Sequence, residues 1–339
     1  MGDLLPKGHH VVGLDIGGTK MMAVVYNHKF KPQGRCRKKS RSSKGAEPAE
    51  KRIVRVIREA LDDAGNPAVS GIGIGSPGPL DPETGVIIDT PNLGWKDFPL
   101  AEIIADEFAV PVTVDNDVNV GTYGEWRFGR FSDCQHIVGV FPGTGIGAGI
   151  IIDGKLLHGF SGAAGEIGHM TLQIDGPLCG CGKRGCVEAL ASRIAIAKEV
   201  AALAAREDAP YVLRNCGTDI STTRSSAIAR AIEAGDTMVE AVVRKAAYLV
   251  GIAVSNVVNI LSPEVVILGG GLVEAMEKLY LEEVKRAMKE HAMPFLRKGV
   301  KIAPAQLGDD AIVLGGACMI AERLRYERSE HEEGPAPGA

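Results

Sequence analysis

The 339-residue sequence lacks a long uninterrupted apolar segment, a signal peptide and a strong excess of charge of either sign. The nearest approach to a membrane span, AAYLVGIAVSNVVNIL, is interrupted by Ser255, Asn256 and Asn259 and therefore predicts none. The first residues, MGDLLPKGHHVVGLDIGG, contain no apolar run before a small-residue cleavage site. A net charge of −4 lacks the basic excess of a nucleic-acid binder. These absences favour a cytoplasmic enzyme with no nucleic-acid or membrane partner.

What the sequence has is an ordinary globular composition, 45% apolar and 24% charged, and enough length for two domains. Its 43 glycines gather in a few short segments, which indicates tight turns or close approach of a ligand to the backbone. The basic stretch KFKPQGRCRKKSRSSK (29–44) lacks interleaved aromatic residues. It therefore predicts a solvated loop or edge strand rather than a nucleic-acid or membrane patch.

Two similar supersecondary units occur about half a chain apart. In HVVGLDIGGTKMMAVVYN, expected strands at 11–16 and 21–26 flank Gly17 and Gly18. HIVGVFPGTGIGAGIIIDGKLL repeats the order of strand, glycine turn and strand. Because strands and helices alternate around both units, the repetition predicts an α/β protein of two related lobes.

The two expected lobes differ in size. Residues 1–118, joined by a C-terminal helix at about 310–326, are predicted to form the small α/β lobe, and residues 119–309 the large one. Apolar periodicity predicts helices near 49–64, 98–108, 188–206, 223–234, 236–261 and 272–291. The polar tail at 327–339 is expected to be disordered.

The segment DIGGTK places Asp15 at the end of a strand, directly before the turn at Gly17 and Gly18. Backbone N–H groups of such a turn can form an anion-binding nest, to which Thr19 adds a hydroxyl and Lys20 a charge. An ordinary hairpin is the alternative. The spacing matches neither the P-loop nor the dinucleotide-binding fingerprint.

A second glycine turn, GTGIGAG (143–149), contains Thr144 in the position that Thr19 has in the first turn. Two such hairpins, one in each lobe, could grip a polyphosphate from both sides, and the pair is more specific than either turn alone. LGGG, with Gly270 and Gly271 between an apolar strand and a helix, is a third candidate, for adenine or ribose. A simple turn at a helix start is its alternative.

The segment VDNDVN (114–119) puts Asp115, Asn116 and Asp117 at the end of an apolar strand. A carboxylate held at that point is a candidate general base for a hydroxyl nucleophile. Helix capping is the alternative, because Asp and Asn are preferred at helix starts. Both roles can coexist, with one acid at the cap and the other facing a cleft.

Three of the seven cysteines lie in GPLCGCGKRGCVEA (176–189), shortly after the histidine of GEIGH. His169, Cys179, Cys181 and Cys186 make a complete tetrahedral set with no open position, which predicts a structural zinc. A catalytic thiol, a redox pair and buried free cysteines are the alternatives, although C-x-C is not the C-x-x-C redox spacing. Glu188 would be held rigidly near the site.

The motifs GLDIGGTK, NLGW, VDNDVN, GTGIGAG, GEIGHM and CGCGKRGCVEA occur in the order found in ROK-family sugar kinases. The chain resembles that family from about residue 11 to 324, and the pattern H…C-x-C-G-x-x-G-C-x-E is highly specific to it. The resemblance implies an actin-like, hexokinase-like fold of two α/β lobes. It also implies ATP and a sugar bound in an interlobe active-site cleft.

The resemblance further implies a role for each motif residue. Asp117 would accept the proton of the sugar 6-hydroxyl, Asp15 would help to place Mg²⁺, and His169 would touch both zinc and sugar. The implied sugar ligands are Asn92, Asn116, Asp117, Glu166, His169 and Glu188. The implied ATP-binding residues are Gly17, Gly18, Thr19, Lys20, Thr144, Gly145, Gly270 and Gly271.

The ROK family also contains repressors with an N-terminal helix-turn-helix domain, and about ten residues before DIGGT leave no room for one. An enzyme is therefore expected. NLGW and the intact E-x-x-H with Glu188 look like glucokinases, which convert D-glucose and ATP to glucose 6-phosphate. An N-acetylhexosamine, fructose or mannose kinase is the alternative, and a non-catalytic sugar sensor is a third hypothesis that Asp117 disfavours. The family implies a homodimer or homotetramer, and polyphosphate or ADP stay open as donors.

Overall fold

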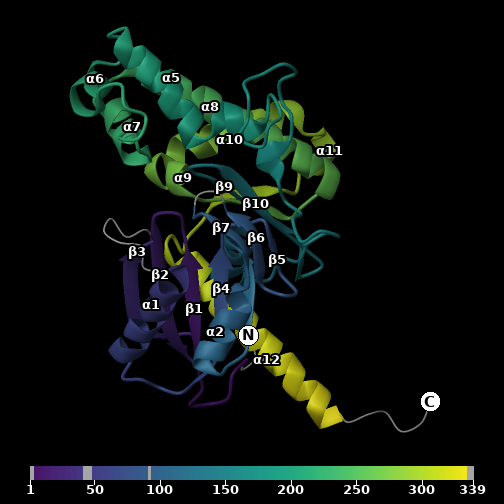
Figure 1. The fold of residues 1–339 in the computed structure, drawn as a ribbon. Helices are drawn as coiled ribbons and strands as arrows, with labels where there is room; N and C mark the ends of the chain where they lie inside the picture. The colour runs from purple at the N-terminus through teal and green to yellow at the C-terminus, as the bar shows by residue number, and fades with distance from the viewer. Residues whose placement is uncertain (1–3, 41–47, 91–92, 334–339) are drawn as a thin grey trace. The chain divides into compact units, whose positions relative to one another are not determined.

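The protein forms two compact α/β units, each built on a five-stranded sheet (Figure 1). The structure is a computed structural model, and it describes residues 4–40, 48–90 and 93–333. Unit 1 comprises the described residues of 1–132, 158–164 and 309–339. Unit 2 comprises Asp133–Leu157 and Gly165–Gly308.

The sheet of unit 1 has the strand order β3-β2-β1-β4-β8, in which β1 and β2 form an antiparallel hairpin and β1, β4 and β8 run parallel. Its strands are β1 (His10–Ile16), β2 (Lys20–Asn27), β3 (Pro32–Lys39), β4 (Val69–Ser76) and β8 (Val112–Asn116). A small antiparallel sheet contains β5 (Leu80–Asp81), β6 (Val86–Thr90) and β7 (Trp95–Phe98). The helices are α1 (Ala49–Asp63), α2 (Leu100–Phe108), α3 (Asp117–Phe128) and α12 (Asp310–Glu333).

Glycines allow α12 to lie directly against the sheet of unit 1. A Cβ at Gly13 of β1 would stand 1.8 Å from the carbonyl oxygen of Val313, and a Cβ at Gly73 of β4 would stand 1.9 Å from that of Gly316. Because no side chain fits at these two points, the helix and strand backbones meet in direct contact. The glycines of β1 and β4 therefore allow α12 to pack closely on the sheet.

Unit 2 repeats the same arrangement, with the strand order β11-β10-β9-β12-β13. Its strands are β9 (Ile137–Pro142), β10 (Ile146–Ile152), β11 (Lys155–Leu156), β12 (Val265–Leu268) and β13 (Lys301–Pro304). Its α-helices are α4 (Val187–Ala191), α5 (Arg193–Ala205), α6 (Pro210–Cys216), α7 (Ser225–Glu233), α8 (Thr237–Leu261), α9 (Gly271–Ala275), α10 (Glu277–His291) and α11 (Pro294–Arg297). Strand β9 pairs antiparallel with β10 and parallel with β12, just as β1 pairs antiparallel with β2 and parallel with β4. The predicted duplicated α/β fold is confirmed.

Helix α8 is long and apolar enough, by length and composition, to cross a membrane, although its polar residues Ser255, Asn256 and Asn259 predicted no span. In unit 2 it is a core helix, with Val243, Val250 and Val254 fully buried. The hydroxyl of Ser255 is satisfied within the helix, since it donates to the carbonyl of Gly251 at 2.7 Å. Burial in the core of unit 2 accounts for the apolar composition of α8.

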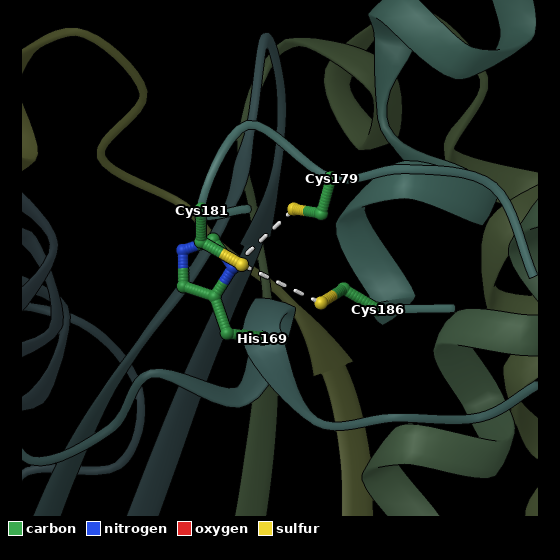
Figure 2. Close-up of side chains that lie close together, drawn as sticks. All are labelled: His169, Cys179, Cys181 and Cys186. Carbon is green, nitrogen blue, oxygen red and sulfur yellow. Dashed lines mark hydrogen bonds between the residues drawn. The ribbon is translucent and has the colours of Figure 1, made fainter. Parts of the chain in front are cut away.

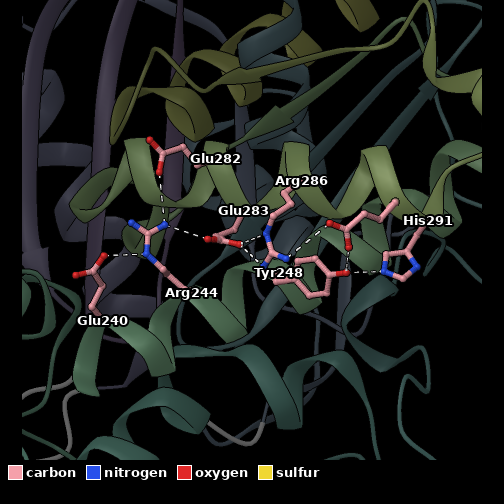
Figure 3. A network of polar contacts seen from close by, with 8 residues as sticks. Glu240, Arg244, Tyr248, Glu282, Glu283, Arg286 and His291 are labelled. Carbon is pink, nitrogen blue, oxygen red and sulfur yellow. Dashed lines mark hydrogen bonds and ion pairs between the residues drawn. The ribbon is translucent and has the colours of Figure 1, made fainter. Parts of the chain in front are cut away.

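A network of charged side chains joins α8 to α10 (Figure 3). Arg244 lies 2.8 Å from Glu240 and 2.9 Å from Glu283. Arg286 lies 2.6 Å from Glu283, and its guanidinium is 4.1 Å from the ring centroid of Tyr248. Burial alone would raise the pKa of Glu283, but the hydrogen bonds from Arg286 and Arg244 outweigh it and lower that pKa. The network therefore links the two helices through an ionised Glu283.

The division into units differs from the expected domain limits. The first boundary follows Ser132 instead of residue 118, because α3 packs against α12 and belongs to the same unit. The segment 158–164, expected in the large lobe, belongs to unit 1. Helix α12 continues to Glu333, so the first part of the tail expected to be disordered is helical.

Two predicted helices are each divided in the structure. Ser192 separates α4 from α5 because its side chain accepts the N–H of Ala195 and begins the second helix. Met276 separates α9 from α10, which also belong to unit 2. Residues 32–39 of the basic stretch form the edge strand β3, one of its two expected forms, and residues 41–44 lie outside the described residues.

Candidate active site

The junction of β8 and α3 carries the acidic motif of unit 1. Asn116 caps α3, since its side-chain oxygen accepts the N–H groups of Val118 at 2.9 Å and Asn119 at 3.4 Å. Asp117 is the first residue of α3, and its Oδ1 also accepts from Val118, at 2.9 Å. The amide thus caps the helix, and the carboxylate of Asp117 lies at its positively polarised end.

Asp115, the other acid of the motif, is buried, with 2% of its surface exposed. Its Oδ1 accepts the backbone N–H of Asn116 at 2.6 Å and the side-chain amide of Asn119 at 3.0 Å. Nε2 of His158 lies 2.6 Å from Oδ2 and acts as the donor, because an ionised carboxylate only accepts. Asp115 therefore anchors the start of α3. No sequence motif indicated His158.

Asp15 is the second-last residue of β1, at the same end of the sheet as Asp115. It pairs with Gly75 of β4, which in turn pairs with Asp115 of β8. Burial, and then the charge of Asp117, raise the pKa of Asp15 to about 7. The parallel strands therefore bring Asp15 and Asp117 within electrostatic range of each other, an arrangement that would attract a divalent cation.

The turn of DIGGTK is a hairpin closed by the N–H of Gly17, which donates to the carbonyl of Lys20 at 2.9 Å. Ser40 clamps this turn: its hydroxyl donates to the carbonyl of Gly17 at 2.5 Å, and its N–H donates to that of Thr19 at 3.0 Å. A Cβ at Gly18 would meet open space. The backbone therefore forms the ordinary hairpin that was the alternative prediction. The open space at Gly18 still leaves room for a ligand.

Lys20 is held by a carboxylate of the same unit. Its Nζ lies 2.7 Å from Oδ1 of Asp309, and Arg37 lies 2.5 Å from Oδ2 of the same residue. The three side chains are about half exposed, so each ion pair contributes little to stability. Lys20 can therefore exchange Asp309 for an anionic ligand at small cost.

The second glycine turn lies between β9 and β10 in unit 2. It is closed by the N–H of Gly143, which donates to the carbonyl of Gly145 at 2.8 Å. Arg193, at the start of α5, donates its N–H to the carbonyl of Gly143 at 2.9 Å and its guanidinium to Oγ1 of Thr144 at 3.2 Å. This arginine orients the hydroxyl of Thr144, a role that no sequence motif indicated.

Glu188 on α4 lies between this turn and the cysteines. Its Oε2 accepts the N–H of Ile146 at 2.9 Å, and a Cβ at Gly145 would stand 2.4 Å from the same oxygen. Its Oε1 is 4.0 Å from Sγ of Cys179. The carboxylate is therefore held in place from two sides, and the glycine is what leaves room for it.

The four predicted zinc ligands lie together in unit 2 (Figure 2). The ligand atoms of His169, Cys179, Cys181 and Cys186 are all within 4.8 Å of one another. Sγ of Cys181 and Cys186 are 3.7 Å apart, and Sγ of Cys179 is 3.6 Å from Nδ1 of His169. A tetrahedron with zinc–sulfur bonds of about 2.3 Å has edges of about 3.8 Å, so this donor set fits zinc.

The thiols of this cluster differ in their surroundings. Burial raises the pKa of Cys186 to about 12, whereas the backbone N–H of Lys183 lowers the pKa of Cys181. Sγ of Cys181 and Sγ of Cys186 are too far apart for a disulfide, whose length is about 2.05 Å, and Cys179 is also a free cysteine. A bound cation would favour the thiolate of Cys186 at neutral pH, as zinc does for its ligands.

His169 connects the cluster to the carboxylate of GEIGH. Its Nδ1 faces Cys179, while its Nε2 lies 3.8 Å from Oε2 of Glu166. The Glu166 side chain is 60% exposed and that of His169 is 35% exposed. An ion bound through Nδ1 would therefore leave Nε2 and Glu166 available to a ligand.

Backbone geometry explains one glycine of the cysteine loop. Gly185 has φ +72°, and a Cβ there would stand 1.7 Å from the carbonyl oxygen of Gln173. No other residue fits at that position, which directly precedes Cys186.

Gly270 and Gly271 lie at the start of α9, where Gly270 has φ +79°. Asn92 lies outside the described residues.

The pattern of the ROK family matches residues 11–323. The chain belongs to the ROK family. This match covers both units, and with it the carboxylates of unit 1 and the histidine–cysteine cluster of unit 2.

Both enzymes and regulators of the ROK family resemble this protein. It is 36% identical over 255 residues to a glucokinase of Halalkalibacterium halodurans, covering 75% of this chain and 76% of that protein. It is 35% identical over 254 residues to a xylose repressor of Caldicellulosiruptor bescii, covering 74% of this chain and 62% of the repressor. A ROK glucokinase from Streptomyces griseus, solved with glucose and AMPPNP, matches with a TM-score of 0.80 and 29% identity over 91% of this chain and 98% of that one. These similarities support a sugar kinase.

Proposed function

We propose that this ROK protein is an ATP-dependent glucokinase, which phosphorylates the 6-hydroxyl of D-glucose to give glucose 6-phosphate. The placement of Asp117 carries the proposal: its carboxylate begins α3, follows the capping Asn116 and lies in the field of the buried Asp15. A carboxylate in this position can accept the hydroxyl proton as the sugar oxygen attacks phosphorus. The relative solved with glucose and AMPPNP supports both substrates.

The proposed sugar-binding residues are polar side chains of four sequence motifs. They are Asn92, Asn116, Asp117, Glu166, His169 and Glu188. Carboxylates, amides and imidazoles suit a sugar because its hydroxyl groups both donate and accept hydrogen bonds. The hydrogen bond from Ile146 orients Glu188, and helix capping orients Asn116, so both side chains are ordered before a sugar binds.

The nucleotide would bind at glycine-rich turns. The proposed residues are Gly17, Gly18, Thr19, Lys20, Thr144, Gly145, Gly270 and Gly271. Asp15 would help to hold Mg²⁺, which neutralises phosphate charge when it is bound. Release of Lys20 from Asp309 would provide a cation for a phosphate, and Arg193 would keep the hydroxyl of Thr144 oriented.

We also propose a structural zinc ion on His169, Cys179, Cys181 and Cys186. The interatomic distances of the cluster and its closed set of four donors support this assignment. The site would hold His169 in one orientation, so that its Nε2 and the carboxylate of Glu166 face the sugar. Zinc content of the purified protein, measured by mass spectrometry, tests this part of the proposal.

Coupled assays test the substrate. Glucose, mannose, fructose, N-acetylglucosamine and N-acetylmannosamine would each be assayed with ATP, ADP and polyphosphate as donors. We expect the highest kcat/KM with glucose and ATP. A strong preference for an N-acetyl sugar would replace glucokinase by N-acetylhexosamine kinase. Sugar binding by calorimetry without turnover of any pair would favour a sensor, in keeping with the repressor relative.

We further propose that the protein is a cytoplasmic homodimer or homotetramer without nucleic-acid or membrane partners. The soluble-type α/β fold with α8 in the core supports this location. Light scattering coupled to size exclusion tests the assembly, since a single species at 35.7 kDa would contradict it.

A further inference from the structure

His158 belongs to a short segment that folds onto unit 1 although both of its flanking segments belong to unit 2. The segment 158–164 closes on itself, since the N–H of Ala164 donates to the carbonyl of His158 at 3.0 Å. It also packs closely on unit 1: a Cβ at Gly162, whose φ is +75°, would stand 2.7 Å from the ring of Pro82. His158 therefore has a defined place in unit 1.

The contact of His158 with unit 1 is a charge-assisted hydrogen bond to a buried acid. Nε2 lies 2.6 Å from Oδ2 of Asp115, which is 2% exposed. The other oxygen of Asp115 accepts from the backbone of Asn116 and the side chain of Asn119. One carboxylate thus connects His158 with two residues that lie on either side of Asp117 in the sequence.

A buried carboxylate needs donors on both of its oxygens. Without His158, Oδ2 of Asp115 would lose its 2.6 Å donor while it remains away from bulk water. The carboxylate would then rotate, take up a proton or admit water. Each response disturbs the bonds on Oδ1 that hold Asn116 and Asn119.

We propose that His158 is a positioning residue for the general base Asp117, acting through Asp115 on the first turn of α3. The inference rests on the proposed function, in which Asp117 takes the proton of the sugar hydroxyl. His158 itself touches no substrate in this proposal. Its effect is on the orientation of Asp117 and Asn116, to which proton transfer is sensitive at the scale of about 1 Å.

The electrostatics of the pair agree with the geometry. The hydrogen bond to Asp115 raises the pKa of His158 above its usual value, although burial opposes the increase. Among the described residues, Asp115 of β8 is the charged group that acts on the imidazole. The imidazolium form of His158 is therefore favoured by the contact that orders the start of α3.

The experiment compares two substitutions of His158 in the full-length protein. His158→Ala removes the donor, whereas His158→Gln keeps an N–H that can reach Asp115. We expect kcat to fall about 10-fold to 100-fold in His158→Ala, with the sugar KM within about threefold of wild type, and to recover most of the loss in His158→Gln. His136→Ala is the matched control, because His136 faces an exposed carboxylate, Asp153, at 3.6 Å.

A structural readout separates this inference from the proposed function. Hydrogen–deuterium exchange of the amides at 116–119 should speed up in His158→Ala and stay at the wild-type rate in His158→Gln and His136→Ala. If the wild type phosphorylates no sugar, the proposed function fails, and faster exchange at 116–119 still supports the link from His158 to α3. If wild type is active, Asp117→Ala is inactive, and His158→Ala keeps full kcat and normal exchange, the inference on His158 is overturned.

A second variant covers the case in which His158→Ala does not fold. Asp115→Asn keeps the shape of the side chain but removes its charge, so it should lower kcat in the same way with little change in KM. A higher KM for the sugar with an unchanged kcat would contradict the positioning role.

Discussion

The two glycine hairpins of this protein have the same backbone design and different surroundings. In unit 1 the turn of β1 and β2 is clamped by Ser40, and Lys20 pairs with Asp309 at the surface. In unit 2 the turn of β9 and β10 is tied to helices through Glu188 and Arg193. The same hairpin design is therefore followed by a pair of carboxylates, Asp15 and Asp117, in one unit and by the histidine–cysteine cluster in the other.

The largest expected effect concerns the acidic edge of unit 1. Asp117→Ala should lower kcat about 10²-fold to 10⁴-fold, because the sugar hydroxyl loses its general base, while glucose binding changes little. Stopped-time assays and calorimetry on the same preparations measure the two quantities. Asp153→Asn is the control, as its side chain is 83% exposed in unit 2 and should leave kcat unchanged. Full activity of Asp117→Ala would remove the assignment of the base.

Loss of a cysteine ligand should affect unit 2 selectively. Cys186→Ser is expected to lower the bound zinc to well below one equivalent and to reduce the free energy of unfolding by several kcal/mol, because metal binding contributes to folding. Mass spectrometry and denaturant titration measure these effects. Cys216→Ser, outside the cluster, should change neither, and an unaltered metal content in Cys186→Ser would argue against zinc at this site.

The raised pKa of Asp15 should make the stability of the protein depend on pH. This pKa is raised from 3.8 to about 7 in the folded protein, so between these values the folded state binds more protons than the unfolded state. Stability therefore falls as pH rises through this window, by about 2 to 4 kcal/mol. In the absence of divalent cations, Asp15→Asn should be more stable than wild type at pH 8 and should lose this advantage near pH 4. A constant difference across that range would contradict the shifted pKa.

The smallest effect is expected at the surface pair of the first hairpin. Lys20→Gln should change the free energy of unfolding by less than about 1 kcal/mol, because Lys20 and Asp309 are 42% and 52% exposed. The variant should nevertheless raise the KM for ATP severalfold if Lys20 binds phosphate. An unchanged KM for ATP would mean that Lys20 does not bind phosphate. Lys155→Gln in unit 2 provides the control.

Much of the fold could be predicted because its signals are local. Gly17 and Gly18 between two apolar runs indicated the first hairpin, and the same pattern around Thr144 indicated the duplication. The preference of Asp and Asn for helix starts gave helix capping as an alternative at 114–119, and α3 does begin at Asp117. Each of these signals depends on residues within a few positions of one another.

Other predictions failed where packing overrides local patterns. The boundary expected at 118 ignored the contact of α3 with α12, which brings together segments almost two hundred residues apart in the sequence. Helix α8 also has the length and composition of a membrane span, although three polar residues predicted none there, and its burial among the other elements of unit 2 shows it to be a core helix. Sequence patterns report how apolar a helix is and not what covers it.

The sequence by itself indicated the duplicated hairpins, the acidic and amide residues at a strand end and the grouping of His169 with three cysteines, because each of these depends on spacing along a short stretch of chain. The tertiary structure alone decided that His158 meets Asp115 and that Arg193 meets Thr144, since 43 and 49 residues separate these partners. A hydrogen bond needs its atoms within about 3 Å of each other. Over such separations only the folded backbone brings them that close.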